Sequence, residues 1–158
     1  MADAKLETLF DKMMRSIDAC DSNALKAVFA TLGLNADDIY ALVNHKVEGE
    51  YTSTPLFCAA DNNDIACCEL LLQHGARIDS GKSDHGDNSL HAAIDNTNIV
   101  LLRLLIENSL DELATSIALC EEDRNGATPM RHALRNGDLE IINYLKEQIG
   151  EEKDGDDM

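Results

Sequence analysis

The chain contains two similar stretches, TPLFCAADNNDIACCELLLQHGA at residues 54–76 and NSLHAAIDNTNIVLLRLLIENSL at residues 88–110, which align without a gap at an offset of 34 residues. The alignment pairs Ala59 with Ala93, and it repeats an Asp-Asn pair and a double leucine. A third stretch, TPMRHALRNGDLEIINYLK at residues 128–146, begins 40 residues after the second. Self-similarity at such a period indicates an array of repeated supersecondary units.

The residue types at fixed places in each stretch predict a helix, a turn and a second helix. Thr54 and Thr128 are suited to N-cap a helix, and each precedes a proline at the first helical position, where no N–H is needed. A run of Asn, Asp and Gly then turns the chain, and Gly75 ends one second helix. One such unit cannot bury its apolar face alone, so we predict a stacked, all-α solenoid.

At these residues the chain resembles the ankyrin repeat. The resemblance is closest over residues 123–145, DRNGATPMRHALRNGDLEIINYL, and it continues in Thr54-Pro55-Leu56, Leu90-His91 and Gly75-Ala76. A degenerate upstream copy is inferred from LKAVFATLG at residues 25–33, which aligns with CCELLLQHG at residues 67–75. The resemblance implies an all-α ankyrin-repeat solenoid of about four helix-turn-helix units, in which His91 is a structural hydrogen-bonding residue.

The organisation predicted from these alignments is a single domain over residues 1–150, followed by a disordered acidic tail over residues 151–158. The tail, EEKDGDDM, has no apolar residue before its last position. The four units are expected to cover approximately residues 5–34, 50–79, 84–109 and 123–149.

Two insertions interrupt the period, and each is predicted to contain a short helix. Asn35 is expected to N-cap a helix over residues 35–44. In the second insertion, Ser109 with Glu112 three positions on forms a capping-box pattern. Apolar residues follow at helical spacing in that segment, namely Leu110, Leu113 and Ile117. The simplest interpretation is padding that extends the outer surface of the stack.

Both ends of the array carry features expected of terminal units. An amphipathic stripe opens the chain, made of Leu6, Leu9, Phe10, Met13 and Ile17. In the last unit, His132 aligns with Cys58 and Ala92, and Lys146 replaces an aliphatic residue. Polar groups at such stacking positions predict that no further unit follows.

The composition is strongly acidic, and this limits the class of partner. The 158 residues include 30 acidic and 13 basic side chains, for a formal net charge of −17. Phosphate backbones and anionic membrane surfaces repel such a chain, which argues against nucleic acid or a membrane as partner. A basic protein segment is the partner that this charge would attract, although net charge also serves solubility.

The sequence favours a location inside the cell, in the cytoplasm or the nucleus. The first residues, MADAKLETLF, lack the apolar core of a signal peptide, and the most apolar run is interrupted by Arg103. Five cysteines, two of them adjacent, do not form a disulfide pattern, which favours a reducing compartment. The chain is predicted to be a monomer.

No catalytic residue, metal site or cofactor is predicted. Ser83, Asp84, His85 and Asp87 lie close in sequence, but adjacency along the chain is not a catalytic triad. The cysteines lack a zinc-binding spacing. By alignment, Cys58, Cys67 and Cys68 are expected to be small buried apolar residues.

The residues expected to bind a partner lie on the turn tips and first-helix ends, by the register of the resembling family. The second unit contributes Glu50, Tyr51, Ser53, Asp61 and Asn62. The third contributes Asp84, His85, Asp87, Asp95 and Asn96, and the fourth contributes Arg124, Asn125, Arg135 and Asn136. Tyr51 is the expected hot spot, as the single aromatic residue of this face. Asn62, Asn96 and Asn136 recur at the same position of the three units. They form a polar ladder, or they serve only the turns.

These observations together predict a protein–protein interaction module, an adaptor or scaffold, that binds another protein on a concave face. The acidic middle units favour a basic segment as the ligand. The alternative is a regulatory or inhibitory protein whose two helical insertions occlude a target enzyme.

Overall fold

The structure is a computed structural model, and it describes residues 2–31, 33–46 and 53–150. Within these ranges the chain forms ten helices and no strand. Their bounds are α1 Ala2–Asp18, α2 Ser22–Phe29, α3 Ala36–Val43, α4 Pro55–Asp61, α5 Ile65–Gln73, α6 Ser89–Asp95, α7 Ile99–Glu107, α8 Glu112–Cys120, α9 Pro129–Asn136 and α10 Leu139–Ile149. The all-α prediction is therefore confirmed over this part of the chain.

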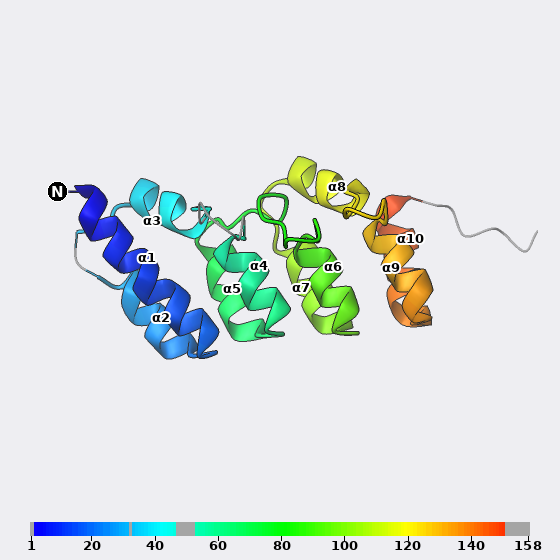
Figure 1. The fold of residues 1–158 in the computed structure, drawn as a ribbon, viewed down its shortest axis with the longest axis horizontal. Coiled ribbons are helices and arrows are strands. Elements are labelled where there is room, and N and C mark those ends of the chain that lie inside the picture. Colours follow the sequence, from blue (N-terminus) through cyan, green and yellow to red (C-terminus); the bar gives the residue numbers. More distant parts are fainter. Residues whose placement is uncertain (1, 32, 47–52, 151–158) are drawn as a thin grey trace, which may run out of the picture.

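The helices form pairs that stand side by side in a row (Figure 1). In this row, α1 contacts α4, α4 contacts α6, and α6 contacts α9, so first helices pack on first helices. The second helices α2, α5 and α7 also contact one another in order. The inserted helices α3 and α8 lie along one edge of the array (Figure 1). The result is the elongated stack that the repeated sequence predicts.

The helix starts are capped by the residues that the sequence singled out. The Thr54 hydroxyl oxygen accepts a hydrogen bond from the Phe57 N–H at 3.4 Å. The Thr128 hydroxyl oxygen accepts one from the Arg131 N–H at 3.3 Å. A proline follows each threonine at the start of the helix, as predicted.

Each turn between paired helices contains one residue in the left-handed region. The φ values are +52° at Cys20, +57° at Asn63, +50° at Thr97 and +74° at Gly137. These four residues occupy equivalent places in the four helix pairs. The turn therefore demands a conformation that glycine and asparagine adopt readily and threonine does not.

The core runs along the whole stack between first and second helices. Ala59, Ala93 and Ala133, which align in sequence, are each fully buried at 0% exposure. A larger side chain at these places would push neighbouring first helices apart, because interiors are close-packed. Cys67 and Cys68 are also fully buried, as predicted, whereas Cys58 is only half-buried. The prediction that Cys58 is a buried core residue is therefore wrong, because its side chain also lines a surface groove.

His91 ties the start of α6 to the turn that precedes α9. Its Nδ1 accepts a hydrogen bond from the Asn88 main-chain N–H at 3.1 Å. Its Nε2–H donates to the Ala127 carbonyl oxygen at 3.0 Å. Burial lowers the pKa of His91, which favours the neutral ring that this pattern requires. The structural role implied by the family resemblance is thus confirmed.

The first inserted helix, α3, begins as the sequence predicts. Asn35 accepts a hydrogen bond from the Asp38 N–H at 2.8 Å, and the Asp38 carboxylate accepts one from the Asn35 N–H at 3.3 Å. This reciprocal pair is a capping box.

The second inserted helix, α8, begins later than the sequence predicts. Its N-cap is Asp111, which accepts hydrogen bonds from two main-chain N–H groups, and the Ser109 hydroxyl instead donates to the Asp111 carbonyl oxygen at 3.2 Å. The expected Ser109 cap is therefore wrong. The guanidinium of Arg77 binds the Asp111 carboxylate at 3.0 Å and that of Asp79 at 2.8 Å, which joins α8 to the loop after α5. A carboxylate at the cap can make both contacts, and a serine cannot.

The ends of the array differ from the sequence-based expectation in one place. Leu9, Met13 and Ile17 of the opening stripe are buried, and Lys146 of α10 is exposed, as expected. His132, however, is only 3% exposed and does not present a polar surface to solvent. The predicted tail at residues 151–158 lies outside the described residues. No helix of the described chain is both long and apolar enough to cross a bilayer.

Candidate functional site: an acidic groove across the first helices

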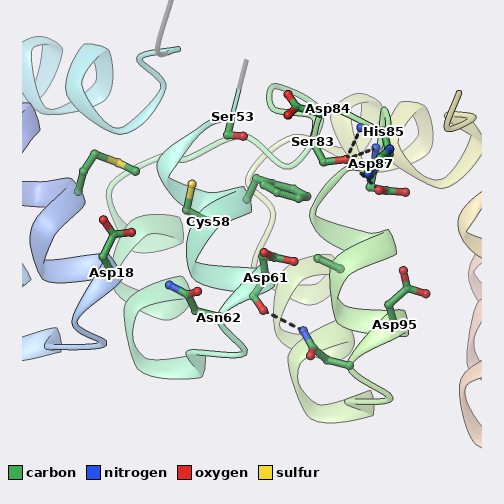
Figure 2. A pocket seen from close by; sticks show the side chains of 14 residues that line it. Asp18, Ser53, Cys58, Asp61, Asn62, Ser83, Asp84, His85, Asp87 and Asp95 are labelled. Carbon is green, nitrogen blue, oxygen red and sulfur yellow. Dashed lines mark hydrogen bonds between the residues drawn. The ribbon is translucent and has the colours of Figure 1, made fainter. Parts of the chain in front are cut away.

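A groove of about 610 Å³ crosses the first helices of the array, from the end of α1 to α6. Its apolar residues are Met14, Phe57, Cys58 and Ala92. Its acidic residues are Asp18, Asp61, Asp84, Asp87 and Asp95. Figure 2 shows Asp18, Asp61 and Asp95 spread along the groove on three successive first helices. The site thus combines apolar contact surface with carboxylates from adjacent units.

Most residues predicted for the second and third units line this groove. They are Ser53, Asp61, Asn62, Asp84, His85, Asp87, Asp95 and Asn96. Glu50 and Tyr51 lie outside the described residues. Arg124, Asn125, Arg135 and Asn136 of the fourth unit are exposed but do not line the groove.

Sequence reasoning missed the contribution of α1 and of the apolar floor. Met14 and Asp18 belong to a unit whose sequence is degenerate, so its first helix could not be placed in register with the others. Cys58 was assigned to the core because it aligns with Ala92. The same alignment could have indicated a shared surface, since the two residues lie one helical turn from Asp61 and Asp95 respectively.

Asp87 and Asp95 of the groove lie near His132, whereas the other three groove carboxylates have no such neighbour among the described residues. In the described part of the chain, no ion pair joins Asp18, Asp61 or Asp84 to a lysine or arginine. Burial, with Asp18 and Asp61 adding to it, raises the pKa of Cys58 to about 11. The thiol is therefore neutral near pH 7, which suits a contact surface and not a nucleophile.

The turn at residues 83–87 is held by its own side chains. The Ser83 hydroxyl donates to the Asp87 carboxylate at 2.8 Å and accepts from the His85 and Asp87 N–H groups at 3.1 and 3.0 Å. The His85 carbonyl oxygen accepts from the Arg124 N–H at 2.8 Å, which links this turn to the next. These contacts give Ser83 a structural role in fixing the rim of the groove.

The three aligned asparagines form a ladder between adjacent units. Their side-chain amides donate to the main-chain oxygen of the preceding first helix, each at 3.2 Å: Asn62 to Ile17, Asn96 to Ala60 and Asn136 to Ile94. The Asn62 and Asn96 amide groups therefore hold neighbouring first helices beside the groove that they line. A partner bound there would meet their remaining carbonyl oxygens.

A cluster of ionisable side chains closes the end of the groove nearest α9. His132 Nδ1 lies 3.0 Å from Asp95 Oδ1, and His132 Nε2 lies 3.1 Å from Asp123 Oδ2. Asp87, His91 and His132 place ligand atoms within 4.8 Å of one another, as a metal site would require. Both ring nitrogens of His91 already make main-chain hydrogen bonds, so a metal there would have to break the link to Ala127 or Asn88.

Comparison with known proteins agrees with this architecture. A family model described as ankyrin repeats (three copies) matches residues 6–115 and 79–157. The chain is 34% identical over 96 residues to the Ankyrin repeat and KH domain-containing protein mask-1 of Caenorhabditis elegans, a match that covers 59% of this chain and 3% of the relative. It is 33% identical over 72 residues to the Ankyrin repeat and SOCS box protein 9 of Homo sapiens, covering 46% of this chain and 23% of that protein.

A third relative is Alpha-latrotoxin-Lt1a of Latrodectus tredecimguttatus, at 28% identity over 94 residues, covering 60% of this chain and 6% of the toxin. The matched region thus spans less than a quarter of the length of each of these relatives. What they share with the chain is the repeat itself, whose aligned helices, caps and turns are described above. The chain belongs to the ankyrin-repeat family.

Proposed function

We propose that this ankyrin-repeat chain is a protein-interaction module that binds a basic segment of another protein in its acidic groove. Ankyrin repeats are protein–protein interaction modules, and the basic ligand is the new part of the proposal. The observation that carries it is the row of Asp18, Asp61 and Asp95, one from each of three first helices, beside an apolar floor.

The chemistry of the groove suits long cationic side chains. Lysine and arginine can lay their apolar stems on Met14 and Phe57 while their charged heads approach the carboxylates. Each exposed ion pair contributes little, on the order of 0–1 kcal/mol, so affinity depends on several pairs acting together. The summed field would speed encounter with a basic partner and would weaken as salt rises.

The remaining predicted residues extend this surface. Glu50 and Tyr51, assigned to this surface by the register of the repeat, would add a carboxylate and an aromatic anchor, with Tyr51 as the hot spot. Arg124 and Arg135 give the last unit the opposite charge, so a partner with an acidic residue at that end would fit the whole face. We further propose a monomer in a reducing compartment of the cell, since the five cysteines are all free thiols.

The inserted helices support a second candidate, a regulator that occludes a target enzyme. On α8, Leu113 is 68% exposed and Ile117 is 41% exposed, one helical turn apart, and Leu110 just before the helix is 82% exposed. Exposed apolar side chains that adjoin one another are a feature of binding surfaces.

The two candidates are distinguished by fluorescence anisotropy with length-matched basic, neutral and acidic peptides. The groove variant is Asp18→Lys with Asp61→Lys; Asp95 is left intact because it contacts His132. The control reverses two exposed charges on second helices, Glu69→Lys with Glu147→Lys. We expect the wild type and the control to bind basic peptides in a salt-dependent manner, and the groove variant to bind at least tenfold more weakly.

Equal binding of basic and acidic peptides, or an unchanged affinity in the groove variant, would move the site away from the groove. A loss of binding in Leu113→Ser with Ile117→Ser, with the groove variant unaffected, would favour the inserted helices instead. Circular dichroism of every variant establishes that the fold is retained.

A further inference from the structure

The buried imidazole of His132 lies among carboxylates from three separate segments. Asp95, at the end of α6, is 3.0 Å from Nδ1, and Asp123, in the loop before α9, is 3.1 Å from Nε2. Asp87, in the turn before α6, is 3.9 Å from Nε2. The side chain of His132 is only 4% exposed. The ring therefore joins α9 to two segments of the preceding helix pair and to the loop between the pairs.

The two carboxylates beside the ring favour its protonated form. Neutral imidazole has one N–H, whereas the two nitrogens of His132 each face a carboxylate oxygen, which can only accept. Asp123 remains ionised because its other oxygen accepts from the Ala127 and Asn125 N–H groups, each at 2.8 Å, which lowers its pKa. Only the imidazolium donates to both carboxylates at once.

Other groups that face the ring oppose or modulate this charge. The guanidinium of Arg135, on α9 itself, lies 3.1 Å from Nδ1 of His132. Its N–H can donate to Nδ1 when the ring is neutral, and its charge disfavours a second positive charge beside it. The ring of His91, on α6, lies 4.7 Å away and is held neutral by its own hydrogen bonds. Burial and the charge of Arg135 lower the pKa of His132. The hydrogen bonds to Asp95 and Asp123, with the negative charge of Asp95, raise it, and the net change is a rise.

We propose that protonated His132 is an ionic latch that holds the α9–α10 pair against the α6–α7 pair, and that deprotonation as pH rises loosens this last pair. The α9–α10 pair ends the described stack, and its first helix packs on α6. A terminal pair of a repeat array has one neighbour to hold it, so the loss of one cross-unit contact acts locally. The inference concerns docking of the pair and is independent of which partner binds the groove.

The direction of the pH effect follows from the change in proton affinity. Because folding raises the pKa of His132, its contribution to docking is fully present below the unfolded value and is lost as pH rises through the folded value. Above that pH, the ring has one N–H, so it donates to only one of the two carboxylates and the other contact across the units is lost.

Nuclear magnetic resonance titration of the histidine ring protons tests the protonation itself. His132→Gln assigns the His132 signal by its disappearance. We expect the His132 midpoint to lie above 6.5, to fall in Asp95→Asn and to rise in Arg135→Gln. A midpoint at or below 6.5, or an unchanged midpoint in Asp95→Asn, would mean that no ionic latch exists.

Amide hydrogen exchange tests whether deprotonation of His132 loosens the α9–α10 pair. After correction for the intrinsic pH dependence of exchange, protection of α9–α10 should fall by at least threefold as pH passes the His132 midpoint, while that of α4–α5 stays constant. Asp95→Asn should shift this fall to lower pH, and the exposed control His85→Gln should leave it unchanged. Constant protection of α9–α10 across the midpoint, or an equal fall in α4–α5, would overturn the latch.

Discussion

The side-chain amide of Asn98 donates a 2.7 Å hydrogen bond to the side-chain oxygen of Asn63, joining equivalent turns of neighbouring units. The oxygen of Asn98 also accepts from the Leu101 N–H at 3.0 Å, as the N-cap of α7. One side chain therefore both starts a helix and connects two units.

The two roles of Asn98 are separable by substitution. Asn98→Ser keeps a capping oxygen but is too short to reach Asn63, so we expect a loss of about 0.5–1.5 kcal/mol in the free energy of unfolding. Asn98→Ala loses the cap as well and should cost about 1 kcal/mol more. Urea denaturation measures both. In Asn63→Gly, which lacks the acceptor, Asn98→Ser should have little further effect; a full additional loss there would contradict the inter-turn bond.

Gly81 is a second place where a small change should have a large effect. Gly81 is buried, and a Cβ built on it would lie 2.7 Å from the main-chain nitrogen of Thr54, the N-cap of α4. Gly81→Ala must displace backbone, and we expect a loss of about 1–3 kcal/mol in the free energy of unfolding. Thermal denaturation measures it, with the neighbouring Ser80→Ala as the control. Equal melting temperatures for both variants would show that the loop yields without cost.

The turn residue Thr97 is predicted to be replaceable with a gain in stability. Its φ of +50° is unfavourable for a β-branched residue, and asparagine tolerates it better. We expect Thr97→Asn to raise the free energy of unfolding by on the order of 1 kcal/mol. The reverse change at the equivalent turn, Asn63→Thr, should lower it, partly through the lost bond to Asn98. A destabilised Thr97→Asn would mean that the hydroxyl makes a contribution that outweighs the backbone strain.

The sequence predicted those parts of the fold that depend on local chemistry repeated at a fixed spacing. The threonine caps and the aligned alanines recur in successive units, and the role of His91 follows from the repeat that the chain resembles. One sequence was therefore enough to place them. The start of α8 was misplaced because both Ser109 and Asp111 are residue types that cap helices. Asp111 is the cap, and it is held by Arg77, which is distant in sequence. Tertiary contacts of this kind leave no local pattern.

The candidate site was predicted in part for the same reason. Asp61 and Asp95 share a register position, and that position predicted that they lie on one surface, where both line the groove. Asp18 was missed because α1 diverges from the repeat, and His132 was taken for a polar end cap. Its burial depends on three carboxylates that only the stacked arrangement brings together.

Thiol reactivity should separate the cysteines by their place in the stack. Cys20 and Cys120 are exposed, whereas Cys67 and Cys68 are fully buried. Burial, followed by contact with Asp64, raises the pKa of Cys67 to about 12, so its reactive thiolate is scarce at neutral pH. We expect iodoacetamide to modify Cys20 and Cys120 in the native protein, and Cys67 and Cys68 only after denaturation, as read by peptide mass spectrometry. Modification of Cys67 or Cys68 at the rate of Cys20 under native conditions would show that the α4–α5 pair opens readily. Both sulfurs are buried in the closed stack, so the reagent reaches them only when the pair opens.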